Sequence, residues 1–101
     1  MYKGYARVAL LDNFNLNKQI NRLREAGCTE IFSEVTIGTS LERPEFKRML
    51  DNLQKGDTVI VTDLARISRS LSDISRIDKL ITSKGAYMKT LDGGVLKWAE
   101  N

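Results

Sequence analysis

Tyr2-Lys3-Gly4-Tyr5-Ala6-Arg7-Val8 (residues 2–8) is the stretch from which the fold follows. It is short, largely apolar and rich in β-forming residues, and it therefore predicts a buried strand. Arg7 lies inside this strand beside Val8, where a charged group needs a specific partner. Three further runs predict strands at Glu30–Val35, Thr58–Val61 and Ala86–Leu91.

Helices are predicted between these strands by apolar residues that recur at helical spacing. We expect the first from Leu16 to Ala26 and the third from Leu71 to Ser83. The second begins at Pro44, whose missing N–H is not needed in a first turn, and ends by Gly56-Asp57. Its apolar face consists of Phe46, Met49, Leu50 and Leu53.

This alternation of strands with helices of about ten residues implies a parallel sheet with right-handed crossovers. We therefore predict an α/β fold: a three-layer, mainly parallel β-sheet with the first strand central and helices on both faces. The last stretch, from Asp92 to Asn101, is expected to form a turn followed by one short helix or a frayed tail.

The composition is that of one globular domain over residues 1–101, with 42% hydrophobic and 29% charged residues. The net charge of +3 permits contact with nucleic acid without demonstrating it.

No apolar run is long enough to span a membrane and no leader precedes the first strand, so we expect a cytoplasmic protein with no membrane partner. Without histidine, and with one cysteine, a zinc site of the usual kind is excluded in practice. That cysteine, Cys28, is expected to be a small buried hydrophobic residue.

Arginines are placed where the predicted strands end. Arg7 and Ala9 lie at the end of the first strand, Arg66 and Arg69 follow the third, and Arg43 lies in the loop after the second. Ligands gather at the carboxyl ends of the strands in open α/β sheets, so these side chains are expected to converge there. Guanidinium groups are planar, always charged and bidentate, and a cluster of them suits a phosphate.

Such a cluster repels itself unless something compensates it. We therefore expect a nearby carboxylate, an ordered anion or a mobile loop around Arg43. Asp12 and Asp63 are the nearest carboxylates in sequence. The alternative is that Arg66 and Arg69, three residues apart, form a solvated face at the start of a helix.

Five blocks of sequence, in order, match the pattern of one protein family. They are Gly4–Val8, Ala26–Cys28 with Ile31–Glu34, Glu42–Pro44, Leu53–Thr58 and Leu64–Leu71. In these blocks the chain resembles the resolvase/invertase family of serine recombinases, from Gly4 to about Leu91. Gln19 also stands near a glutamine of that family's first helix.

The resemblance implies a serine that attacks a DNA phosphate and forms a phosphoserine link to the 5′ end, without a metal or cofactor. By position, Arg7, Arg43, Arg66 and Arg69 would be the catalytic arginines and would bind the DNA phosphate. Ala9 stands at the position of the nucleophilic serine. Its methyl group has no lone pair and cannot attack phosphorus.

Further departures from the family's pattern accompany Ala9. Ala65 replaces the acid of the family's Leu-Asp-Arg, a candidate for proton handling or for positioning an arginine. Ile37-Gly38 stands where Ser-Gly is usual, and Asp12–Gln19 is one residue longer than the family's pattern.

Other hydroxyl groups are candidates for the missing nucleophile. They belong to Ser33, Ser40, Ser68 and Ser70. Serines at the start of a helix usually cap backbone N–H groups, and capping is the role we expect for Ser68 and Ser70.

The resulting hypothesis is the catalytic domain of a site-specific DNA recombinase that acts on DNA phosphodiesters and is cleavage-deficient because of Ala9. We expect the chain to lack the family's long dimerisation helix and helix-turn-helix module, and to have DNA and a second copy or related recombinase subunit as partners. The alternative is a non-catalytic resolvase-like module that binds a protein partner or DNA. A phosphate-binding α/β domain unrelated to recombination would require the five blocks to be a coincidence.

Overall fold

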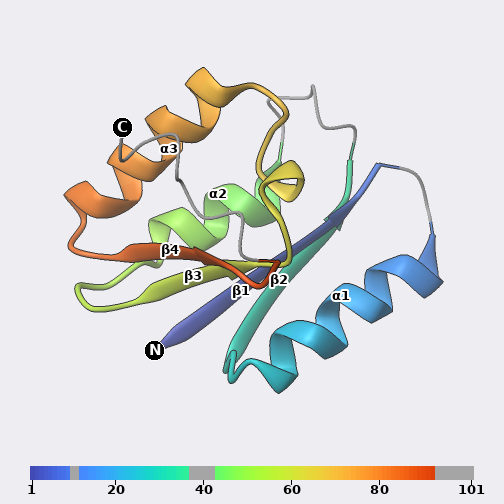
Figure 1. Ribbon diagram of the computed structural model, residues 1–101. Helices are drawn as coiled ribbons and strands as arrows, with labels where there is room; N and C mark the ends of the chain where they lie inside the picture. Colours follow the sequence, from blue (N-terminus) through green and yellow to red (C-terminus); the bar gives the residue numbers. More distant parts are fainter. Residues whose placement is uncertain (10–11, 37–42, 93–101) are drawn as a thin grey trace.

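The computed structural model describes residues 1–9, 12–36 and 43–92 (Figure 1). Strands and helices alternate along the chain. Their order is β1 (Tyr2–Val8), α1 (Asn13–Glu25), β2 (Glu30–Val35), α2 (Pro44–Asp51), β3 (Thr58–Val61), the 3-10 helix η1 (Leu64–Arg66), α3 (Leu71–Ser83) and β4 (Tyr87–Thr90).

The four strands form one parallel sheet in the order β2-β1-β3-β4, so β1 is an inner strand. Helix α1 covers one face of the sheet, and α2 and α3 cover the other (Figure 1). This arrangement confirms the predicted three-layer α/β fold. It also places the ends of β1, β2 and β3 at a common carboxyl edge.

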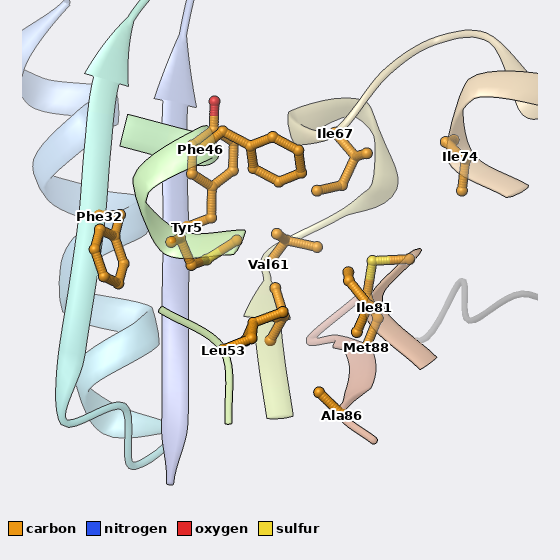
Figure 2. Packing of buried hydrophobic residues seen from close by; sticks show 12 residues of the cluster. Tyr5, Phe32, Phe46, Leu53, Val61, Ile67, Ile74, Ile81, Ala86 and Met88 are labelled. Atoms are coloured by element: carbon orange, nitrogen blue, oxygen red, sulfur yellow. The ribbon is translucent and has the colours of Figure 1, made fainter. Parts of the chain in front are cut away.

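Two apolar clusters hold the three layers together. The larger lies under α2 and α3 (Figure 2) and contains Tyr5, Phe32, Phe46, Met49, Leu53, Val59, Val61, Ile67, Ile74, Ile81, Ala86 and Met88. The smaller lies under α1 and contains Ala6, Leu23 and Ile60. Successive residues of β1, Tyr5 and Ala6, belong to different clusters because side chains alternate between the faces of a strand.

The observed elements differ from the sequence predictions mainly at their ends. Helix α1 begins at Asn13 instead of Leu16, because the Asp12 carboxylate accepts the Asn15 N–H at 3.1 Å and caps the helix. Helix α2 ends at Asp51, and Leu53 enters the core from the turn beyond it. The fourth strand is shorter than predicted, and Cys28 is half-buried where full burial was expected. The turn and tail expected after Asp92 lie outside the described residues.

A buried ion pair closes the amino edge of the sheet. Lys3 of β1 is 4% exposed, and its ammonium lies 3.1 Å from Asp57 and donates to the Asn52 carbonyl at 2.6 Å. Burial raises the pKa of Asp57, but the Gln54 N–H and the Lys3 ammonium outweigh it and hold that pKa below its usual value.

None of the helices in the described ranges is long and apolar enough to cross a membrane.

The Lys3–Asp57 pair predicts an acid-dependent part of the stability. Because the folded pKa of Asp57 is depressed, its contribution is present above the unfolded pKa of about 3.9 and is lost as pH falls through the folded value. We expect Asp57→Asn to lower the free energy of unfolding at neutral pH, by a margin that shrinks as pH falls below about 4. Urea unfolding between neutral and acid pH measures this margin. Asp51→Asn, at an exposed position, serves as control, and a margin independent of pH would contradict the assignment.

Helix α3 offers a matched test of the larger core. Ile81 is fully buried, whereas its neighbour Leu80 is 45% exposed. We expect Ile81→Ala to lower the free energy of unfolding by about 2–5 kcal/mol, since it removes buried methyl groups and leaves a cavity. Leu80→Ala should cost about 1 kcal/mol or less. Equal losses in urea unfolding would show that α3 does not pack as described.

Candidate functional site

The short helix η1 lies just beyond the end of β3 and is fixed at both of its ends. Asp63 precedes it, and its carboxylate Oδ1 accepts the Ala65 N–H at 2.9 Å. Ile67 follows it and is fully buried. The next turn leads into α3, where Ser68 accepts the Ser70 N–H at 3.0 Å.

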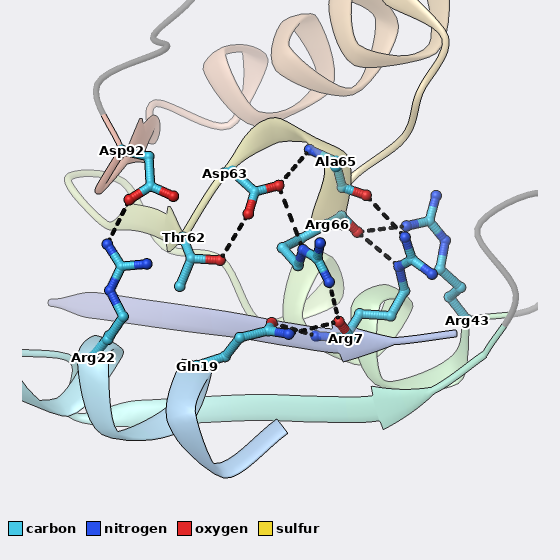
Figure 3. Close-up of polar contacts among 9 residues, drawn as sticks. All are labelled: Arg7, Gln19, Arg22, Arg43, Thr62, Asp63, Ala65, Arg66 and Asp92. Atoms are coloured by element: carbon cyan, nitrogen blue, oxygen red, sulfur yellow. Dashed lines mark hydrogen bonds and ion pairs between the residues drawn. The ribbon is translucent and has the colours of Figure 1, made fainter. Parts of the chain in front are cut away.

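Arg7, at the end of β1, is 5% exposed and has backbone carbonyls as its partners (Figure 3). Its Nε donates to the Arg66 carbonyl at 3.0 Å, and its Nη2 donates to the Ala65 carbonyl at 2.8 Å. Nη1 donates to the Thr36 carbonyl, just past β2, at 2.8 Å. Burial lowers the pKa of Arg7, and the nearby cations Arg43 and Arg66 act in the same direction. The side chain thus connects β1, the end of β2 and η1.

Gln19, on the buried face of α1, completes the hydrogen bonding of the Arg7 backbone. Its Oε1 accepts the Arg7 N–H at 3.0 Å, and its Nε2 donates to the Arg7 carbonyl at 2.9 Å. The pairing of β1 with β3 ends at Gly4, so the Arg7 peptide has no strand partner on the side of β1 that faces β3. The Gln19 amide takes the place of that strand.

Arg66 projects from η1 and is held at two of its nitrogens (Figure 3). Nη1 donates to the Arg7 carbonyl at 2.8 Å, and Nε lies 3.4 Å from Asp63 Oδ1. The second Asp63 oxygen accepts the Thr62 hydroxyl at 3.3 Å. Arg66 and Asp63 are partly exposed, with side-chain exposures of 27% and 37%.

Arg43 also contacts η1, at the same Arg66 carbonyl that accepts from Arg7. Its Nη1 donates to the Arg66 carbonyl at 3.2 Å, and its guanidinium lies 5.2 Å from the centre of the Phe46 ring. Arg43 precedes α2, whose first N–H groups at Glu45 and Phe46 each donate to the Glu34 carboxylate at 3.2 Å. That carboxylate also accepts the Tyr5 hydroxyl at 2.6 Å, and burial of Tyr5 raises the pKa of its hydroxyl. Glu34 therefore fixes the start of α2 and, with it, the position of Arg43.

A cavity of about 450 Å³ opens beside Ala9, between α1 and the loop after β3. Its lining comprises Val8, Ala9, Asp12, Asn15, Lys18, Gln19, Arg22, Thr62, Asp63 and Arg66. Of the four arginines predicted from the sequence, Arg66 alone belongs to this lining. At the rim, Arg22 pairs with Asp92 at 2.5 Å.

The structure brings Arg7, Arg43 and Arg66 together around η1, as the sequence predicts. Arg69 is exposed, and it makes no hydrogen bond or ion pair with the described residues. Asp63 supplies the expected carboxylate, whereas Asp12 caps α1 at the far side of the cavity. Within the described ranges, no group of three or more His, Cys, Asp or Glu side chains is placed to hold a metal ion.

Sequence reasoning missed the role of Gln19 and the partners of Arg7. The signal for Gln19 was a polar residue four positions before Leu23 on the buried face of α1. The backbone carbonyls that hold Arg7 left no signal in the sequence. Of the alternative serines, Ser68 and Ser70 take part in the turn and cap before α3, and Ser40 lies outside the described residues.

A family model described as "Resolvase, N terminal domain" matches residues 3–100. The chain belongs to this family. Among its relatives, a resolvase of Clostridium perfringens is 45% identical over 93 residues, which cover 90% of this chain and 49% of the relative. The serine recombinase gin of Escherichia phage Mu is 37% identical over 95 residues, which cover 94% of this chain and 49% of that protein. The chain thus spans about half the length of these relatives.

Solved structures support the resolvase-type fold. The C-terminal catalytic domain of an IS607-like serine recombinase matches with a TM-score of 0.79 at 21% identity, over 98% of this chain and 72% of that one. A serine recombinase from Sulfolobus solfataricus matches with a TM-score of 0.77 at 19% identity, over 90% of this chain and 67% of that one. At these identities the similarity concerns the fold.

The Gln19 contact yields a stability prediction for this resolvase-type domain. Gln19→Ala would leave the buried Arg7 N–H without its partner, and we expect it to lower the free energy of unfolding by about 1–3 kcal/mol. Lys18→Ala, at the exposed neighbouring position, should change it by about 0.5 kcal/mol or less. Urea unfolding compares the two. A loss no larger at position 19 than at position 18 would show that the amide does not stabilise the end of β1.

Proposed function

We propose that this chain is the catalytic-domain portion of a site-specific serine recombinase, that it binds DNA phosphodiesters at the arginine-rich edge of its sheet, and that it does not cleave them. The observation that supports this most directly is the cavity shared by Ala9 and Arg66. A serine at position 9 and the guanidinium of residue 66 would face one space. Relatives named resolvase, DNA-invertase and serine recombinase support the choice of substrate class.

The proposed loss of cleavage rests on the side chain of Ala9. This residue is exposed at the end of β1 and lines the cavity, which is where the family resemblance puts the nucleophile. A methyl group offers no oxygen to attack phosphorus, so the transfer of the DNA strand to the protein cannot begin there. Ser68 is 6% exposed and already accepts the Ser70 N–H, which argues against it as a substitute.

Phosphate binding is assigned to the same edge. Arg66 keeps an exposed fraction of 27% beside the cavity, and Arg69 is exposed in the turn that follows. Arg7 and Arg43 lie behind Arg66 around its carbonyl and add positive charge. We propose that Arg66 and Arg69 contact the phosphates directly, while Arg7 and Arg43 raise the local potential and fix the geometry.

A non-catalytic module that binds a protein partner is the second candidate function. Ala9 itself favours it, because a domain without its nucleophile gains nothing from the chemistry of the site. In that case the arginine edge would be retained for the fold, through the contacts of Arg7 with the backbone. The two functions differ in whether DNA binds to this edge.

A strand-cleavage assay tests the catalytic part of the proposal. With nicked, labelled duplex DNA, we expect the chain to give no covalent 5′-linked product on a denaturing gel. Ala9→Ser should give at most partial cleavage, since the oxygen returns but the acid expected at position 65 is still missing. Ala9→Val, which adds bulk without a nucleophile, is the control. A covalent product from the unsubstituted chain would overturn the proposal by showing that another residue attacks.

Salt-dependent binding tests the assignment of the DNA surface. We expect weak, sequence-independent binding of duplex DNA, and each of Arg66→Ala and Arg69→Ala should reduce the slope of log K against log salt by about 0.9. Arg24→Ala removes the same charge from the last turn of α1, away from the cavity, and should leave the slope nearly unchanged. Fluorescence anisotropy over a salt series measures the slopes. Binding unaffected at both positions would favour the protein-partner function.

A further inference from the structure

The carboxylate beside Arg66 comes from a different position than the family resemblance predicts. Residue 65 is alanine, so the acid expected immediately before Arg66 is absent. Asp63, two residues earlier, has its Oδ1 at 3.4 Å from Arg66 Nε. We propose that Asp63 is the positioning residue of the site and orients the Arg66 guanidinium toward the cavity beside Ala9. The consequence for DNA rests on the function proposed above, whereas the orientation itself does not.

The Asp63 carboxylate is itself held in place by the residues around it. Oδ1 accepts the Ala65 N–H at 2.9 Å, and Oδ2 accepts the hydroxyl of Thr62, which is 2% exposed, at 3.3 Å. Thr62 belongs to the short segment that joins β3 to η1, and Ala65 belongs to η1 itself. An acceptor fixed in this way can define the direction of a long, flexible arginine side chain.

The guanidinium of Arg66 is held from two sides. Asp63 lies at Nε, and the Arg7 carbonyl accepts from Nη1 at 2.8 Å. No partner for Nη2 is found among the described residues, and Arg66 lines the cavity. Two of the three guanidinium nitrogens are thereby anchored, and the remaining donors stay available to an anion.

The negative charge of Asp63, considered alone, would weaken the binding of DNA, whereas the positioning role would strengthen it. A carboxylate in the lining of a cavity repels an anion, so removal of its charge should strengthen the binding of DNA. Asp12 is the second carboxylate of the same lining, and it caps α1 without contacting Arg66. A comparison of substitutions at Asp63 and Asp12 therefore distinguishes the effect of positioning Arg66 on DNA binding from the effect of the negative charge alone.

The test compares Asp63→Asn with Asp12→Asn in the whole chain. Asparagine keeps an oxygen that can cap a helix, so both variants lose the charge while the caps are retained. We expect Asp12→Asn to bind duplex DNA somewhat more tightly. Asp63→Asn should bind about threefold to tenfold more weakly, because one charge-assisted contact loses its alignment. Tighter binding by Asp63→Asn would overturn the positioning role.

A spectroscopic measurement on the free protein makes the inference independent of DNA. The Arg66 Nε–H resonance, assigned by its loss in Arg66→Lys, should shift and exchange faster with solvent in Asp63→Asn but not in Asp12→Asn. Adding Ala65→Asp to Asp63→Asn returns an acid to the neighbouring position and should restore part of the DNA affinity. An Arg66 resonance unchanged in Asp63→Asn would overturn the inference. A changed resonance without any effect on DNA binding would support the positioning role and count against the proposed DNA surface.

Discussion

The guanidinium of Arg7 lies between the end of β1 and the first turn of η1, 5% exposed, with a backbone carbonyl at each of its three nitrogens. A buried charge is costly unless strong hydrogen bonds replace its water. Here the acceptors come from the segment after β2 and from η1, so satisfying one charge also fixes two connections. The carboxyl edge of the sheet depends on this interaction, since one β1 side chain ties both connections together, next to the single bonds from the Thr36 N–H to the Val8 carbonyl and from Arg66 to the Arg7 carbonyl.

The contacts of Arg7 and Arg66 are reciprocal. Arg7 donates to the Arg66 carbonyl, and Arg66 donates to the Arg7 carbonyl. The Arg66 carbonyl also accepts from Arg43, which uses both of its lone pairs. Three like charges can therefore share a small volume, because each of them is turned toward the negative end of a peptide dipole. Asp63 supplies the full negative charge on the side where Arg66 meets the cavity.

The regular elements could be predicted from the sequence because hydrophobic periodicity reports burial directly. The bounds predicted for β1, β2, β3 and α3 agree with the structure. The start of α1 was placed too late because Asp12–Asn15 is polar apart from the exposed Phe14, and polar residues in a first turn look like loop until the cap is recognised. The convergence of Arg7, Arg43 and Arg66 followed from topology alone, because parallel strands end at one edge. What could not be predicted was which atoms meet, since backbone carbonyls are present at every residue and leave no signal.

The separation between Ala9 and the arginine framework bears on the loss of cleavage proposed above. Among the described residues, the hydrogen bonds that hold Arg7, Arg43 and Arg66 use carbonyls of residues 7, 36, 65 and 66 and the carboxylate of Asp63, and none of these bonds uses an atom of residue 9. Ala9 is exposed, so its side chain adds little to the packing of either core. Either a methyl or a hydroxymethyl side chain at position 9 is therefore compatible with the same arrangement of the arginine edge. Asp63 contributes more to the structure than Ala9 does, because its carboxylate caps η1 and also contacts Arg66. The orientation of the guanidinium and the start of η1 therefore depend on the same carboxylate.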